Sequence, residues 1–212
     1  MRLGKSTKAV LLLYVPSFGV LFAIYLLARI KDLPIGTFTW DPAAIANVHP
    51  LVGVLSNIGV LLWSWTAAVC IFTGFVVLRT TSDKSEAYYF LSFGFLTLLL
   101  SIDDFFLFHE VLAERYLGLG EKTVYSAYLI LTMTYIAHYW RKIVFDEPLL
   151  LVIALAGFGT SLAADLFLEP LLEATWSLYY LLEDGSKFLG IVGWFGYFVV
   201  RSYKAMTKIP RV

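Results

Sequence analysis

The sequence predicts an all-α protein: a polytopic bundle of about six transmembrane helices, forming a single transmembrane domain over residues 1–212. Three observations predict this fold. The chain is 59% hydrophobic, 15% charged and has a mean hydropathy of +0.77, which is typical of membrane proteins and not of chains that fold in water. Apolar runs of roughly 20 residues, long enough to cross roughly 30 Å of bilayer hydrocarbon, recur along the chain. Short polar stretches separate them.

Each predicted span is one of these apolar runs. The approximate bounds are 9–30, 51–78, 87–112, 123–140, 148–168 and 174–203. The first span contains Pro16, which removes a backbone donor and is expected to kink the helix. The stretch 31–50 is rich in proline and is expected to be an irregular loop. Close packing against a neighbouring helix is expected at four glycines of the last span, Gly185, Gly190, Gly193 and Gly196.

The direction of the spans follows from the basic residues, because Lys and Arg collect in short cytoplasmic loops. With six spans, both termini lie on the same side as the second and fourth loops, and that side carries most of the 16 basic residues. The opposite side carries only Arg29, Lys31, Arg115 and Lys122. We therefore expect both termini in the cytoplasm and the protein in a bacterial-type inner membrane or a plasma membrane. The zero formal net charge gives no indication of a nucleic-acid partner.

Acidic residues gather in the outer halves of the predicted spans. They are Asp103, Asp104, Glu110, Asp165, Glu169, Glu183 and Asp184. His109 lies among them, and His49 lies at the outer mouth of the second span. An ionisable side chain that faces lipid costs roughly 2.5–3.5 kcal/mol on insertion scales. These side chains are therefore expected to face an outward-opening polar cavity in the bundle.

Helical periodicity limits which side chains of the third span can act together. Asp103 and Glu110 are seven residues apart and share one face of a continuous helix. Asp104 and His109 are turned away from that face, in opposite directions. The pattern predicts that these four side chains do not all point into one pocket.

The fifth and sixth spans supply the other predicted walls of the cavity. Asp165 and Glu169 are four residues apart and share a face. Glu183 and Lys187 have the spacing and order of an ion pair on one helix, and Glu183 or Asp184 would form the third wall. If Glu183 pairs with Lys187, no basic residue remains at the same depth in the bilayer to pair with the other buried acids. They are then expected to be protonated, hydrated or bound to an ion.

Carboxylates with imidazoles bind Zn, Mn or Fe, whereas an all-oxygen set also suits Ca, and the sequence does not distinguish these metals. The predicted ligands are Asp103, Asp104, His109, Glu110, Asp165 and Asp184, with His49 as an additional candidate. If the protein is an enzyme, we expect a metal-dependent hydrolase of a lipid-like substrate, with Asp104 or Glu183 as the general base.

The combination of carboxylates and histidines inside a helical bundle resembles, in type, the alkaline ceramidase and adiponectin-receptor superfamily of seven-span zinc hydrolases. That superfamily has two histidines four residues apart in its last helix, whereas the last span here has none. No site residue is therefore transferred from it.

Three other functions stay open. The same acids are suited to a cation or proton channel or transporter. They are equally suited to pairing with another chain, in a homo-oligomer or as a non-catalytic subunit of a larger membrane complex. Finally, the acid-x3-Lys spacing of Glu183 and Lys187 resembles microbial rhodopsins, which implies a Schiff base between Lys187 and a retinal-type cofactor.

Cys70 is the single cysteine and excludes an intrachain disulfide.

Overall fold

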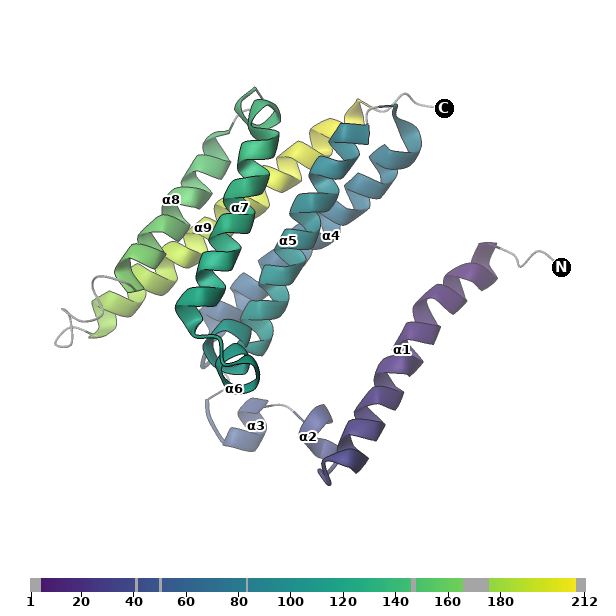
Figure 1. The fold of residues 1–212 in the computed structure, drawn as a ribbon, viewed down its shortest axis with the longest axis vertical. Helices are drawn as coiled ribbons and strands as arrows, with labels where there is room; N and C mark the ends of the chain where they lie inside the picture. Colours follow the sequence, from purple (N-terminus) through teal and green to yellow (C-terminus); the bar gives the residue numbers. More distant parts are fainter. Residues whose placement is uncertain are drawn as a thin grey trace. The chain divides into compact units, whose positions relative to one another are not determined.

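The computed structural model describes residues 5–40, 42–49, 51–82, 84–145, 148–165 and 176–208, and all regular secondary structure in these ranges is helical (Figure 1). The elements are α1 (Lys5–Ile30), α2 (Gly36–Thr39), α3 (Pro42–Ala46), α4 (Val54–Thr80), α5 (Lys84–Phe106), the π-helical η1 (Phe108–Leu112), α6 (Ala113–Leu117), α7 (Glu121–Val144), α8 (Leu149–Ala163) and α9 (Trp176–Thr207). The all-helical prediction is confirmed. The stretch 31–50, expected to be irregular, contains the two short helices α2 and α3.

Each predicted span overlaps one of the long helices α1, α4, α5, α7, α8 and α9. In the part of the chain that the structure describes, three helices are long and apolar enough to cross a membrane: α1 over Leu13–Ile30, α4 and α5. The helix α8 is apolar but shorter. The structure therefore supports three candidate spans, and six spans stay a prediction.

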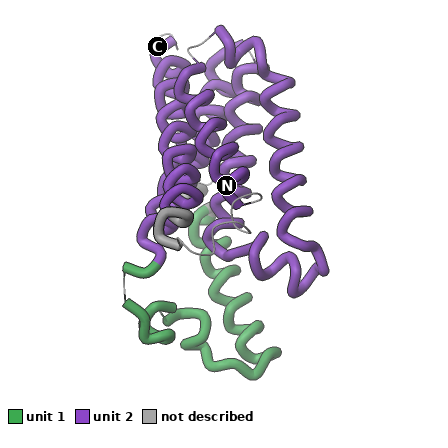
Figure 2. Tube along the Cα trace, turned by 90° about the vertical axis from the view of Figure 1, so that its left-hand side faces the viewer, with its two compact units in different colours: residues 1–52 green, residues 53–212 purple. Residues whose placement is uncertain are grey.

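The chain divides into two compact units, residues 1–52 and 53–212 (Figure 2). The first unit holds α1, α2 and α3, and Pro16 lies inside α1. The second unit holds all the other helices. Whether the two units form one transmembrane domain stays a prediction.

The second unit is a helical bundle in which consecutive long helices alternate in direction (Figure 1). Within it, α4 packs against α5 and α9, α8 packs against α9, and α7 packs against α5. Large aromatic side chains fill the core. Tyr89, Phe90 and Phe93 of α5 and Trp194 and Phe198 of α9 are all at most 1% exposed. Such rings bury more apolar area than other side chains and dominate the energetics of a core.

Glycines bring α8 and α9 into backbone contact. A Cβ atom added to Gly157 of α8 would lie 2.7 Å from the backbone nitrogen of Gly190. On the facing side, Cβ atoms added to Gly190 and Gly193 would lie 3.0 Å from backbone oxygens of α8. The predicted close packing is confirmed at Gly190 and Gly193. A Cβ on Gly185 would meet only the side chain of Leu181, at 3.7 Å, so the prediction does not hold there.

Candidate metal-binding cavity

A cavity of about 730 Å³ lies inside the second unit and is lined by residues of α4, α5, η1, α7, α8 and α9. Seven acidic side chains line it: Asp103, Asp104, Glu110, Glu121, Asp165, Glu183 and Asp184. His109 and Lys187 line it as well. We call this space the acidic cavity. It brings together side chains from all three walls that the sequence predicts.

The four polar residues of the third predicted span line this one cavity, and the prediction that they point in different directions is wrong. The cause is a break at Leu107, where the backbone adopts the left-handed conformation (φ 52°, ψ 44°) between α5 and η1. This conformation costs a residue other than glycine roughly 1–2 kcal/mol. The break resets the helical phase, so His109 and Glu110 turn toward the side where Asp103 and Asp104 lie.

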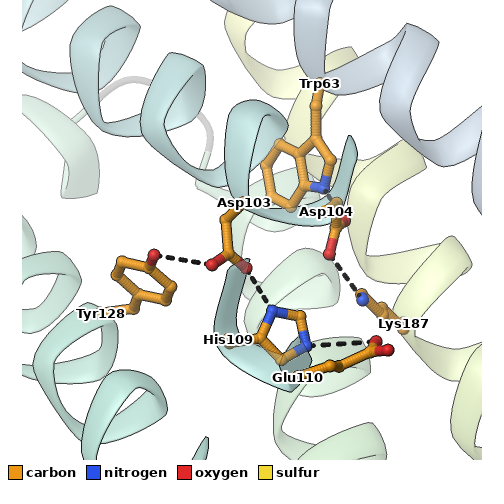
Figure 3. A network of polar contacts seen from close by, with 7 residues as sticks. All are labelled: Trp63, Asp103, Asp104, His109, Glu110, Tyr128 and Lys187. Atoms are coloured by element: carbon orange, nitrogen blue, oxygen red, sulfur yellow. Dashed lines mark hydrogen bonds and ion pairs between the residues drawn. The ribbon is translucent and has the colours of Figure 1, made fainter. Parts of the chain in front are cut away.

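Asp103 is held by two neighbours (Figure 3). Its Oδ2 atom pairs with Nδ1 of His109, and its Oδ1 atom accepts a hydrogen bond of 2.8 Å from the hydroxyl of Tyr128 on α7. Asp103 is 4% exposed and His109 is 1% exposed. Both carboxylate oxygens of this buried acid are therefore occupied.

Asp104 pairs with Lys187, whereas the sequence predicts that Lys187 pairs with Glu183. Nζ of Lys187 on α9 lies 2.8 Å from Oδ1 of Asp104, and Nε1 of Trp63 on α4 donates a hydrogen bond of 3.0 Å to Oδ2. The Asp104 side chain is 11% exposed. A carboxylate this sheltered gains more from a cation than one in water, because Coulomb interactions strengthen in a lower dielectric. The expectation that Asp104 has no positively charged partner is thus corrected.

His109 has one occupied and one available nitrogen. While Nδ1 pairs with Asp103, Nε2 is buried and makes no hydrogen bond to any residue that the structure describes. Nε2 lies 3.4 Å from Oε1 of Glu110, and the imidazole packs on the ring of Tyr125 at a centroid distance of 4.7 Å. Asp103, Asp104 and His109 could hold a metal ion, since one ligand atom from each lies within 4.8 Å of the others.

The other predicted site residues are placed as follows. Asp165, Glu183 and Asp184 line the acidic cavity, as expected. Glu169 lies outside the described residues. His49 belongs to the first unit, where its Nδ1 accepts a hydrogen bond of 3.2 Å from the backbone of Leu51.

Sequence reasoning missed Trp63 and Tyr128, which bind the two aspartates. Aromatic residues in membrane proteins commonly lie in the headgroup region, so composition alone indicates no polar role for these two. Both residues lie well inside their helices and not at the ends. That interior position, together with their polar N–H and O–H groups, is the signal that could have identified them.

A second polar cluster lies elsewhere in the bundle and was also missed. Oε2 of Glu86 on α5 lies 2.9 Å from Nζ of Lys142 on α7, and Oε1 lies 3.0 Å from Nη2 of Arg201 on α9. The Arg201 guanidinium lies 5.3 Å from the centre of the Tyr89 ring. We call these four residues the Glu86 cluster. It ties three helices together with one carboxylate and two cations.

A family model described as a domain of unknown function, DUF8692, matches residues 8–201 of this chain. No curated protein and no solved structure matches this chain.

Proposed function

This chain belongs to the DUF8692 family, and we propose that it is an integral membrane protein that binds a divalent metal ion in its acidic cavity. The observation that carries the proposal is the environment of His109. One nitrogen of this buried imidazole is held by a carboxylate, and the other faces a second carboxylate at the distance expected for two ligands of one metal.

Two features support the location in a membrane. Besides the three candidate spans, large apolar side chains on α4 and α5 are more than half exposed, including Phe72, Phe75 and Phe95. Several hydroxyl groups along the helices donate to a carbonyl of their own helix; Thr134, for example, donates to the carbonyl of Ile130 at 2.7 Å. Polar groups need such internal partners where lipid replaces water. We propose six spans with both termini in the cytoplasm, in an inner or plasma membrane.

The geometry around His109 fits a metal ligand. A ligating histidine usually donates its other ring N–H to a carboxylate, which fixes the tautomer and raises ligand basicity. Asp103 is placed for this role at Nδ1. Two ligands each about 2.1 Å from a tetrahedral metal lie about 3.4 Å apart, and the distance from Nε2 of His109 to Oε1 of Glu110 is 3.4 Å. His109 and Glu110 are thus the proposed direct ligands.

The other acids have different proposed roles. Asp103 positions His109, and the charge of Asp104 is compensated by Lys187. Asp165 and Asp184 line the same cavity and are candidates for completing the coordination. A ligand set of one imidazole and carboxylates suits Zn, Mn or Fe better than Ca, which prefers oxygen ligands only.

Several observations order the functions that the sequence left open. Between the acidic cavity and Glu86, α5 carries the buried rings of Phe93, Phe90 and Tyr89, which favours a binding site over a conduction path. Both oxygens of Asp104 are occupied, so Glu183 is the better candidate for the base of a hydrolase. An ammonium group paired with Asp104 is a poor nucleophile, which disfavours a Schiff base at Lys187.

Elemental analysis of the detergent-purified protein tests the proposal. We expect a stoichiometric transition metal in the wild type and its loss in His109→Ala. His138→Ala is the matched control, because His138 packs against Tyr139 and does not line the cavity. Absence of any metal after incubation with Zn, Mn and Fe, or retention of the metal in His109→Ala, would overturn the proposal.

A further inference from the structure

We infer that the acidic cavity also binds a single-chain amphiphile with a positively charged head group. This inference goes beyond the metal site and does not require the metal. A volume of about 730 Å³ is far more than one ion needs, and it falls in the roughly 300–1,000 Å³ range of pockets that hold small organic ligands. The lining indicates which kind of molecule fits.

Polar and apolar side chains are segregated along α7 and α9. In α7, Glu121 stands at the start of the helix and Met133 lies 12 residues, or about 18 Å, further along. In α9, Asp184 comes ten residues before Trp194. Since both helices begin at the same end of the bundle (Figure 1), their acidic residues lie together.

The helices that run in the opposite direction have the opposite order. In α5, Leu100 precedes Asp103. Leu155 of α8 precedes Asp165, which lies two residues beyond the end of α8, by ten residues. The four helices therefore give the cavity one apolar end and one acidic end. The acidic end is formed by Glu110, Glu121, Asp165, Glu183 and Asp184.

The apolar end is largely aromatic. The Trp63 and Phe158 rings stack with centroids 5.6 Å apart, and the Trp194 ring meets both of them edge-on, at 6.1 Å from each. Leu100 and Leu155 complete this wall. Asp104, which accepts the hydrogen bond from Trp63, and Thr132 are polar residues near this wall. The aromatic and aliphatic side chains gain free energy when a hydrocarbon chain displaces water from them.

The acidic end determines the charge of the head group. Among the described residues that line the cavity there are seven carboxylates and one ammonium group, that of Lys187, which is already paired with Asp104. A positively charged head group relieves the repulsion among these carboxylates, whereas an anionic head group adds to it. His109, whose buried Nε2 atom makes no hydrogen bond to a described residue, is among the residues that line the same space.

The test compares three probes with the same 12-carbon chain, dodecylamine, dodecanol and dodecanoate, titrated into the full-length protein in nanodiscs, with empty nanodiscs subtracted. We expect saturable binding of dodecylamine, at least tenfold weaker binding of dodecanol and no saturable binding of dodecanoate. Equal binding of all three probes, or no saturable binding of dodecylamine, would overturn the inference.

Two variants locate the bound molecule. Gly159 lines the cavity, and a Cβ there meets nothing within 4 Å, so Gly159→Phe should fill the cavity and weaken dodecylamine binding at least tenfold. Gly19→Phe is the matched control, since a Cβ on Gly19 also has open space and Gly19 lies outside the cavity. Asp184→Asn should weaken the binding of dodecylamine but not that of dodecanol. Unchanged amine binding in both cavity variants would contradict the inference.

Metal content measured on the same samples separates the two proposals. Metal without amine binding would refute the amphiphile and leave the metal site intact. Saturable amine binding that is sensitive to Gly159→Phe, in a protein without metal, would support the amphiphile and refute the metal site.

Discussion

The acidic cavity and the Glu86 cluster use the same kinds of residue in different ways. In the Glu86 cluster, one carboxylate is shared by two cations, and the cationic Arg201 also lies over an aromatic ring. Among the described residues that line the acidic cavity there are seven carboxylates and one lysine. Among the described residues, the first arrangement pairs one carboxylate with two cations, and carboxylates predominate in the second.

This difference separates a structural from a functional use of buried charge. In the Glu86 cluster, both oxygens of one carboxylate pair with cations from two other helices. The acidic cavity satisfies Asp103 and Asp104 internally but keeps one nitrogen of His109 available. Charged residues inside a membrane are costly and usually functional, and our proposals assign the ligand to the acidic cavity because carboxylates predominate there.

The largest expected effect is the loss of stability in Glu86→Ala. Removing the carboxylate leaves Arg201, whose side chain is 10% exposed, and Lys142 without this counter-charge, which costs about 3–5 kcal/mol for a buried pair. Reversible unfolding in detergent measures the loss. Metal content should be unchanged once the variant is folded.

The matched control is Glu114→Ala, because Glu114 is exposed and lies outside both regions. We expect its effect on the free energy of unfolding to stay within about 0.5 kcal/mol. Loss of metal in Glu86→Ala, or equal stability of the two variants, would show that the two regions are not independent.

The pair between Asp104 and Lys187 should give the next largest effect. Asp104→Asn and Lys187→Met are each expected to lower the free energy of unfolding by about 1–3 kcal/mol, because each change leaves a partly buried group without its partner. In the double variant the losses should fall short of additivity by at least about 0.5 kcal/mol, as is typical for residues in direct contact.

A second cycle provides the control for this pair. Glu183→Gln combined with Lys187→Met should be additive within about 0.5 kcal/mol if Lys187 binds Asp104 and not Glu183. Strong coupling between Glu183 and Lys187, with none between Asp104 and Lys187, would instead support the ion pair between Glu183 and Lys187 that the sequence predicts.

The sequence predicts the helices well because their determinants are local. Long apolar runs located all six long helices, and the spacing of glycines indicated the contact that Gly190 and Gly193 make with α8. The clustering of acidic residues in the outer halves of the predicted spans also follows from the sequence. Each of these features depends on residues that are near one another in the chain.

The details of the site depend on contacts that are distant in the chain and on one local exception. Lys187 and Asp104 are 83 residues apart, and Trp63 and Asp104 are 41 residues apart. Leu107 breaks the helix in a left-handed conformation, although its neighbours contain neither glycine nor proline to signal a break. Strain of this kind at a residue other than glycine is often found at functional sites, and here it brings His109 to Asp103.

A smaller effect is expected from Asp103→Asn, on metal affinity more than on stability. The amide cannot supply the negative charge at Nδ1 of His109, and loss of such a supporting carboxylate typically weakens metal binding about 10–100-fold. Competition with a chelator of known affinity measures the change. Unaltered metal affinity in this variant would show that Asp103 does not position His109.

The smallest expected effect is that of Tyr128→Phe, which removes only the hydrogen bond to Oδ1 of Asp103. One hydrogen bond contributes roughly 0.5–1.5 kcal/mol, so we expect a weakening of metal binding by roughly 2–10-fold. We expect Asp103→Asn to weaken metal binding more than Tyr128→Phe, because Asp103 contacts the proposed ligand His109 and Tyr128 contacts only Asp103. A larger loss of metal affinity in Tyr128→Phe would contradict the proposed geometry.

The most direct test of the central claim, that His109 binds a metal in the acidic cavity, is X-ray absorption spectroscopy of the metal-loaded protein. We predict the scattering signature of one imidazole, together with oxygen ligands at about 2.0–2.2 Å, and loss of the imidazole signature in His109→Ala but not in His138→Ala. A loaded wild-type protein without an imidazole ligand, or one whose spectrum is unchanged by His109→Ala, would contradict the account.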